Sequence, residues 1–339
     1  MVRRQTRDVR PCIGEAVPAW VVPIVLPTPY PIGPVTVYLL TGDPLTLVDT
    51  GPATGVAWRA LNAALAERSL RPVDVRRVLL THAHHDHFGL ARRFIRLGAS
   101  LAAHPGERRN LRLDRGWGLL WCQLGLAGMS VSRRLALFAG LRALDRTARR
   151  VSSFEPLVQG QELPHEHGPI RVHHLPGHTP GHVGFELGGE GVAITGDTVL
   201  DGRVPNAVVD SDPDRPGEPF QALAAYAATL AYLETLRLRL LMPAHGPCIA
   251  DVAGQVAALG ERQSRRSAQV REVLAGGPAT VSDVMTRLFP RVALLGSFLA
   301  FSEVLGHILE LERRGEVRRL SGHRRDRWEL DGRAVQRPG

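Results

Sequence analysis

The sequence contains no lysine, so all 42 of its basic residues are arginines. With 33 acidic residues, the formal net charge is +9. This excess of positive charge favours an acidic partner, such as nucleic acid, a phosphorylated cofactor or a membrane surface. Arginines spread over a solvated surface explain the same composition equally well. The charge by itself therefore selects no partner.

Cysteine is also scarce. Cys12, Cys122 and Cys248 stand far apart and form no C-x-x-C pair. This spacing argues against a disulfide framework and against a thiolate zinc cage. We therefore expect a protein of the reducing cytoplasm, with Cys248 as a small packed residue.

Long apolar runs are missing as well. A membrane span needs roughly 18 to 20 uninterrupted apolar residues, and prolines break the apolar segment 19–34. The basic N-terminus lacks an apolar stretch of signal-peptide length. With 44% hydrophobic and 22% charged residues, the chain has enough apolar material for a packed core. We expect a soluble globular protein without a membrane span.

The chain of 339 residues is long enough for one large domain and one small one. Short β-branched runs alternate with helical spacing, which predicts mixed sheets with helices packed outside. Residues 106–150 interrupt this order with arginine clusters and amphipathic spacing, so we expect an inserted helical cap. Three helices and a hairpin are expected near the C-terminus, as in a winged-helix module. The predicted domains are 1–254, which includes the cap, and 255–339.

The stretch THAHHDH, residues 81–87, holds four histidines and one aspartate directly after an apolar run. Residues two apart on an extended segment project to the same side, so His82 and His84 can reach one ion. Asp86 and His87 follow where the chain turns into the next helix, and they face a neighbouring position. Zinc favours imidazole nitrogen and carboxylate oxygen. The stretch therefore predicts two ligands for each of two metal ions, rather than a histidine-rich surface loop that binds nothing.

Three later junctions between a strand and a loop each offer one more ligand: His178 in LPGHTPGH, Asp197 in ITGDTVL and His245 in MPAHGP. Each follows an apolar strand, so all can gather along one edge of the fold. In this order, and behind LTLVDTG, the motifs resemble those of the metallo-β-lactamase-fold hydrolases over roughly residues 20–250. The resemblance implies an α/β protein, a four-layer αββα sandwich with its site at one edge of two sheets.

The resemblance also implies a role for each motif residue. One metal ion would be bound by His82, His84 and His178. The other would be bound by Asp86, His87 and His245, and Asp197 would bridge the two ions. Asp49 in LVDTG would orient the ligand loop, and an ordinary turn aspartate is the alternative. The remaining histidines near these motifs are expected to pack, turn or support rather than bind metal: His85, His104, His173, His174 and His182.

The types of ligand narrow the branch of this family. His84 stands where the flavodiiron proteins carry a glutamate, which disfavours a di-iron oxygen site. No cysteine stands at a ligand position, which separates the chain from the penicillin-hydrolysing enzymes with a thiolate zinc site. The set is similar to that of the glyoxalase-II-like branch, which is related to the endoribonuclease called β-lactamase-like protein. Such enzymes hydrolyse thioesters, esters or phosphodiesters.

The resemblance therefore predicts a hydrolase with two Zn²⁺ ions, or iron or manganese in their place, and a bridging hydroxide as nucleophile. Asp86 would orient the nucleophile, and Asp197 would carry a proton to the leaving group. The first hypothesis for the substrate is a small thioester or ester, acyl-CoA-like or glutathione-thioester-like. Trp117, Trp121 and Met129 would line an acyl pocket, unless the insertion is an ordinary cap with solvated arginines.

A metal-dependent endoribonuclease is the second hypothesis. Seven arginines near the C-terminus would then meet an RNA backbone: Arg313, Arg314, Arg318, Arg319, Arg324, Arg325 and Arg327. The third helix of this region is apolar and acidic, a composition that fits packing inside the protein better than insertion into a nucleic-acid groove. No aromatic residues that could stack on bases accompany the arginines. A regulator or scaffold without turnover is disfavoured by the complete ligand set. The sequence leaves a homodimer open.

Overall fold

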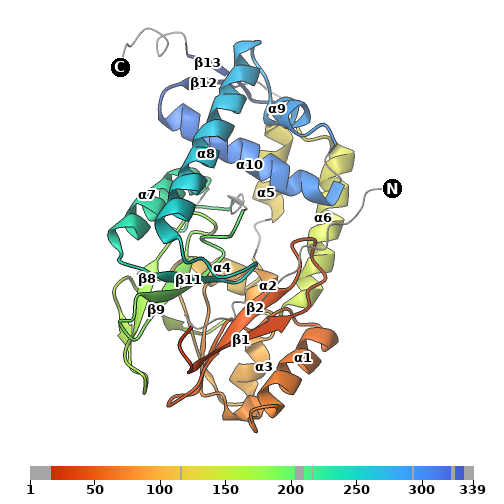
Figure 1. Cartoon of the computed structure of the whole chain (residues 1–339). Coiled ribbons are helices and arrows are strands. Elements are labelled where there is room, and N and C mark those ends of the chain that lie inside the picture. Colours follow the sequence, from red (N-terminus) through yellow and green to blue (C-terminus); the bar gives the residue numbers. More distant parts are fainter. Residues whose placement is uncertain are drawn as a thin grey trace.

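The computed structural model describes residues 17–114, 117–202, 210–215, 217–291, 294–321 and 325–331. Two large β-sheets, in the lower half of Figure 1, carry helices on their outer sides. The first sheet has six strands in sequence order: β1 (Val21–Leu26), β2 (Val35–Leu40), β3 (Thr46–Val48), β4 (Arg77–Leu79), β5 (Ser100–Ala103) and β6 (Glu155–Pro156). The second sheet has five in reverse order: β11 (Leu240–Pro243), β10 (Val192–Gly196), β9 (Val183–Leu187), β8 (Ile170–His174) and β7 (Glu162–Leu163).

Apolar side chains fill the space between the two sheets. Tyr38 and Leu79 of the first sheet belong to the same buried cluster as Phe185 and Ile194 of the second. All six residues of β2 are buried, which is the pattern of a strand covered on both faces rather than one facing water.

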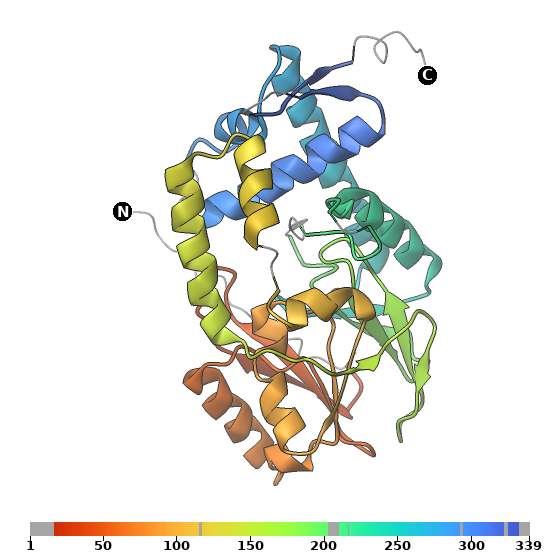
Figure 2. The ribbon, with the colours of Figure 1, turned by 180° about the vertical axis from the view of Figure 1, so that it is seen from behind.

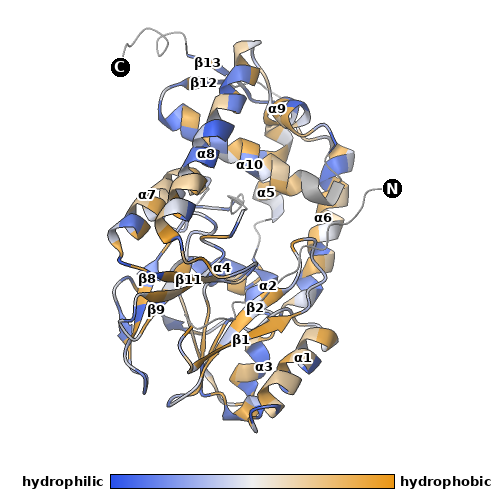
Figure 3. Cartoon of the chain, in the orientation of Figure 1, coloured by the Kyte–Doolittle hydropathy of each residue, from blue (hydrophilic) through white to orange (hydrophobic). Residues whose placement is uncertain are grey.

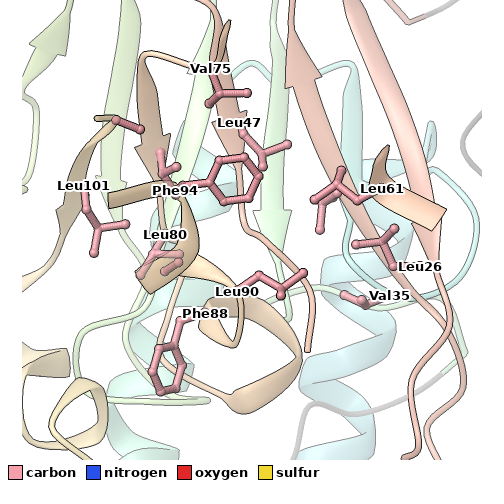
Figure 4. Packing of buried hydrophobic residues seen from close by; sticks show 14 of the residues in the cluster. Leu26, Val35, Leu47, Leu61, Val75, Leu80, Phe88, Leu90, Phe94 and Leu101 are labelled. Atoms are coloured by element: carbon pink, nitrogen blue, oxygen red, sulfur yellow. The ribbon is translucent and has the colours of Figure 1, made fainter. Parts of the chain in front are cut away.

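Helices cover the two outer faces. Leu61 of α1 (Gly55–Ala66) lies beside Leu26 of the first sheet, and Phe94 of α3 (Ala91–Arg96) lies beside Leu47, all within one buried cluster (Figure 4). On the second sheet, Leu241 packs with residues of α7 (Ala222–Thr235) and with the first turns of α8 (Val252–Ala275). The expected four layers, α, β, β and α, are therefore present.

The strand directions bring several strand ends to one edge. β3 runs parallel to β4, and β10 runs parallel to β11. β8 and β10 both pair antiparallel with β9, so they share a direction. The carboxyl ends of these strands, and the loops that follow them, can therefore meet at one side of the sandwich.

The insertion and the C-terminal region share one hydrophobic core. The insertion forms short turns and two longer helices: η2 (Pro105–Glu107), α4 (Arg108–Leu111), α5 (Trp117–Leu126), α6 (Val131–Leu144) and η3 (Asp145–Thr147). The C-terminal region contributes α9 (Val281–Leu288), α10 (Leu294–Arg313), β12 (Val317–Leu320) and β13 (Arg327–Leu330). Figure 2 shows α5 and α6 against the C-terminal helices. Their shared cluster, called the C-terminal core below, includes Leu124, Met129, Val270, Val284, Phe301, Ile308 and Trp328.

This packing favours the alternative of an ordinary helical cap over the acyl pocket. Met129 is buried in the C-terminal core, with 4% of its surface exposed, so its side chain packs against the C-terminal helices. Trp117 and Trp121 both pack on Phe138 of α6. An amphipathic pattern shows that one face of a helix is buried, but not what covers it.

The C-terminal region contains the three helices and the antiparallel strand pair that the sequence predicts. Its first helix, α8, begins at Val252 and continues through the predicted boundary at 254. Val256 packs near the second sheet, whereas Val270 lies in the C-terminal core. The division into two domains and the winged-helix assignment stay predictions.

The cysteines differ from the expectation. Cys248 is disulfide-bonded, while Cys122 is an exposed free thiol, and Cys12 lies outside the described residues. Cys248 does pack against the cluster between the two sheets, as expected. The expectation that it forms no disulfide is wrong, because distance along the sequence does not measure distance in the fold.

The distribution of hydropathy follows the layers. In Figure 3, β1 and β2 are mostly hydrophobic, whereas much of α8 is hydrophilic. Among the described helices, none is both long and apolar enough to cross a membrane.

Candidate metal centre

The histidines and aspartates singled out by the sequence meet at the edge where strands of both sheets end. His82 follows β4, and α2 (His85–Phe88) begins directly after His84. Asp197 directly follows β10, and His245 comes two residues after β11. Segments far apart in the sequence therefore bring these side chains to one place.

His82, His84 and His178 form the first group. The Nδ1 atom of His84 lies 3.0 Å from Nε2 of His82 and 3.0 Å from Nε2 of His178. Nitrogens around a tetrahedral zinc ion would lie roughly 3.3 Å apart, given Zn–N bonds of about 2.0–2.1 Å. The three imidazoles are thus spaced as ligands of one ion would be.

Asp86, His87 and His245 form the second group, and all three are buried. The Nε2 atom of His245 lies 3.4 Å from Oδ2 of Asp86. Nε2 of His87 lies 3.8 Å from Oδ1 of the same carboxylate. Within each group, the candidate ligand atoms lie within 4.8 Å of one another.

Asp197 stands between the two groups. Its Oδ2 atom is 3.5 Å from Nε2 of His178 in the first group. Its Oδ1 atom is 3.6 Å from Nε2 of His87 and 3.7 Å from Nε2 of His245 in the second. One carboxylate therefore faces both groups, as a bridging ligand would.

Asp49 supports one ligand from each group. Its Oδ2 atom accepts hydrogen bonds from Nδ1 of His87 at 2.8 Å and from the Thr81 hydroxyl at 2.7 Å. Since the Thr81 proton points to Asp49, the Thr81 oxygen can accept from Nδ1 of His82, 3.1 Å away. The Nε2 atoms of His82 and His87 are then left with lone pairs that face the cluster.

His245 is oriented in the same way, because its Nδ1 atom donates to the Pro34 carbonyl at 2.8 Å. Three buried atoms at the centre of the cluster have no hydrogen-bond partner: His87 Nε2, His245 Nε2 and Asp197 Oδ1. Buried polar atoms are nearly always paired, so this set fits bound cations.

The electrostatics differ between the two groups. Burial, followed by the neighbouring imidazoles, holds the pKa of His82 well below its ordinary value. Burial would also lower the pKa of His87, but the carboxylates of Asp197, Asp49 and Asp86 raise it well above that value. Although burial opposes ionisation of Asp197, His245 and His87 keep its pKa well below the usual range. The site therefore combines ionised carboxylates with imidazoles.

The other histidines lie outside these groups. Nε2 of His85 faces Asp145 of the insertion at 3.4 Å, His104 stacks on His174, and His173 contacts Tyr232 and Glu186. His182 accepts a hydrogen bond from the Asp197 amide at 3.1 Å and stacks on His82. Thr81 directly precedes His82, and its hydroxyl links Asp49 to His82, but a single threonine gives no sequence signal for this role.

Comparisons with known proteins agree with this geometry. The profile of the Metallo-beta-lactamase superfamily matches residues 30–245, and the chain belongs to this superfamily. The Probable metallo-hydrolase YqjP of Bacillus subtilis (strain 168) is 30% identical over 304 residues, which cover 86% of this chain and 92% of that protein. Superfamily membership and the buried ligand groups identify a metal-dependent hydrolase.

A solved structure extends the likeness to nearly the whole chain. The metallo-beta-lactamase family protein TTHA1429 of Thermus thermophilus has a TM-score of 0.80 and 29% identity, covering 92% of this chain and 99% of its own. The Atrochrysone carboxyl ACP thioesterase of Aspergillus terreus is 32% identical over 121 residues, or 36% of this chain and 34% of that protein. The matched part thus spans about a third of the thioesterase.

Proposed function

We propose that the chain is a dinuclear-metal hydrolase that cleaves thioesters or esters. The observation that carries the metal centre is the set of three buried atoms without a hydrogen-bond partner, His87 Nε2, His245 Nε2 and Asp197 Oδ1. The proposed ligands are those that the motifs predict: His82, His84 and His178 for one ion, Asp86, His87 and His245 for the other, and Asp197 for both.

Two Zn²⁺ ions, or iron or manganese in their place, would supply Lewis acidity and a nucleophile at neutral pH. Both oxygens of Asp86 face imidazoles of the second group, and Asp86 would orient the attacking water. Asp197 would hold the proton that the departing thiolate or alkoxide takes.

Two observations favour a thioester or ester over RNA. The Aspergillus terreus relative is named as a thioesterase of an acyl carrier protein. In addition, arginines proposed for RNA binding are engaged within the protein. Arg313 and Arg314 both pair with Glu310, and two further pairs are Arg318 with Glu329 and Arg319 with Asp326. Paired arginines contribute less field at a phosphate, while Arg324 lies outside the described residues.

The proposal is tested by removing metal with a chelator and restoring Zn²⁺, Mn²⁺ or Fe²⁺ before assays with an acyl-CoA, a p-nitrophenyl ester and a short RNA. We expect metal to restore hydrolysis of the acyl-CoA or the ester. His84→Ala and Asp197→Asn should lower that rate by roughly 100-fold or more, because each removes a group that holds the metal centre. The exposed His167 offers a matched control, and His167→Ala should retain the rate.

Two results would overturn the proposal. Full metal content and full rate in His84→Ala or Asp197→Asn would remove the metal centre from the reaction. Metal-dependent RNA cleavage that falls steeply with salt, without thioester or ester hydrolysis, would establish the endoribonuclease instead.

A further inference from the structure

A buried carboxylate outside the ligand set joins the two loops that carry the first group of imidazoles. Glu107, the last residue of η2, is 0% exposed. Its Oε2 atom accepts from the Ala83 amide at 2.9 Å. Its Oε1 atom accepts from the Thr179 hydroxyl at 2.5 Å and from the Gly181 amide at 2.9 Å.

The donors to Glu107 lie in the two loops that carry His82, His84 and His178. Ala83 stands between His82 and His84, and Thr179 directly follows His178. One rigid group therefore fixes the His82–His84 segment relative to the His178 loop. These are the segments whose nitrogens converge within 3.0 Å at His84.

The backbone of η2 packs closely against the backbone of the His178 loop. A Cβ atom on Gly106 would lie 2.9 Å from the Cα atom of Gly181, and one on Gly181 would lie 2.7 Å from the Glu107 nitrogen. Beside this contact, the rings of His104 and His174 stack with centroids 4.0 Å apart. Only glycines allow such an approach, so η2 and the His178 loop are held at a fixed distance.

A carboxylate matches this surrounding better than an amide. An ionised carboxylate only accepts hydrogen bonds, and here it meets three donors. A glutamine of the same shape would turn its NH₂ group towards at least one N–H or O–H donor. Burial raises the pKa of Glu107 to about 7, and the hydrogen bonds from Thr179, Ala83 and Gly181 oppose this rise because they stabilise the ionised form.

We propose that Glu107 is a positioning residue that sets the spacing of His82, His84 and His178 and thereby the metal affinity of this group. The inference rests on the proposed metal centre. It assigns no contact between Glu107 and the substrate.

The test compares metal binding in Glu107→Gln, Thr179→Val and Thr179→Ser. Zn²⁺ affinities are measured by competition with a chromophoric chelator, and ligand geometry is followed by the absorption bands of bound Co²⁺. We expect Glu107→Gln to weaken one of two bound ions by roughly 10–100-fold and to shift its Co²⁺ bands, while the other ion is retained. Thr179→Val should weaken the same ion less, and Thr179→Ser, which keeps the hydroxyl, should restore it.

Glu310→Gln is the matched control, because Glu310 is also a buried carboxylate that accepts hydrogen bonds, here from Arg313 and Arg314. It belongs to α10 and not to the loops that carry the proposed ligands. This control variant should leave both affinities unchanged. Wild-type affinities and Co²⁺ bands in Glu107→Gln would overturn the inference, as would losses that merely follow a lower melting temperature of the metal-free protein. If Glu107→Gln does not fold, the Thr179 pair decides.

The same measurements separate this inference from the proposed function. A wild-type protein that binds no metal would refute the metal centre and the inference together. A wild-type protein that binds two ions and hydrolyses a thioester, beside a Glu107→Gln variant with unchanged affinities, would refute only the role of Glu107.

Discussion

The orientation of three of the imidazoles is set by the hydrogen-bond acceptor of the Nδ1 atom. Asp49 fixes His87, the Thr81 hydroxyl fixes His82, and the Pro34 carbonyl fixes His245. In each case one ring nitrogen donates away from the site, so the other keeps its lone pair for a cation. Asp49 adopts a positive φ of 59°, a backbone conformation that aspartate tolerates better than most residues.

Asp49→Asn is therefore expected to weaken metal binding. Asp49 meets three donors, the Thr81 amide, the Thr81 hydroxyl and His87 Nδ1, whereas an asparagine offers one oxygen and a competing NH₂ group. We expect metal affinity to fall by roughly 10–100-fold, measured by chelator competition. The exposed Asp43 provides the control substitution, Asp43→Asn. An unchanged affinity in Asp49→Asn would show that the imidazoles are oriented without this carboxylate.

At the scale of elements, the sequence predicts the strands that carry the ligands well. Buried strands such as β4 and β10 are short apolar runs, and the polar residue after each run marks the site edge. The packing partner of α5 could not be predicted, since its apolar spacing fits a pocket and the C-terminal core equally well. Glu107 also gave no signal, because a single glutamate in a loop has no period, and its three donors come from segments distant in the sequence.

The pairing of α8 with α10 predicts how stability responds to acid. His307 of α10 is 1% exposed, and its Nδ1 atom lies 2.9 Å from the Ser267 hydroxyl of α8. Burial, and then Arg266, lower the pKa of His307 to about 3, with Glu310 opposing them. The unfolded chain binds a proton near the ordinary pKa of about 6.5. Stability is therefore present above that value and is lost as the pH falls towards 3.

His307→Gln should remove this dependence, because glutamine can bond Ser267 but does not titrate. Between pH 7 and pH 5 the metal-free wild-type protein should lose about 2 kcal/mol more unfolding free energy than the variant. Urea denaturation at both pH values measures the difference. His167→Gln, at an exposed imidazole, should lose stability as the wild-type does. Equal losses in His307→Gln and wild-type would mean that His307 is protonated in the folded protein.

At the scale of the whole molecule, α6 connects the C-terminal core with the metal-binding loop. Near its start, Met129 packs in the C-terminal core. Beyond its end, Asp145 of η3 faces His85 at 3.4 Å, and the Thr147 carbonyl accepts from the Ala53 amide at 2.6 Å. The insertion and the C-terminal helices are thus one packed unit that reaches the site, rather than a separate appendage.

This unit should respond to a core substitution as a whole. Met129→Ala removes a buried side chain from the cluster that contains Phe301 and Trp328, at a cost of about 2–5 kcal/mol. Because α5, α9 and α10 share that cluster, their amide hydrogen exchange should accelerate together, as followed by mass spectrometry of peptides. Leu65→Ala creates a comparable cavity beneath α1 and should leave α9 and α10 protected. Faster exchange confined to α5 after Met129→Ala would show that the insertion and the C-terminal region open independently.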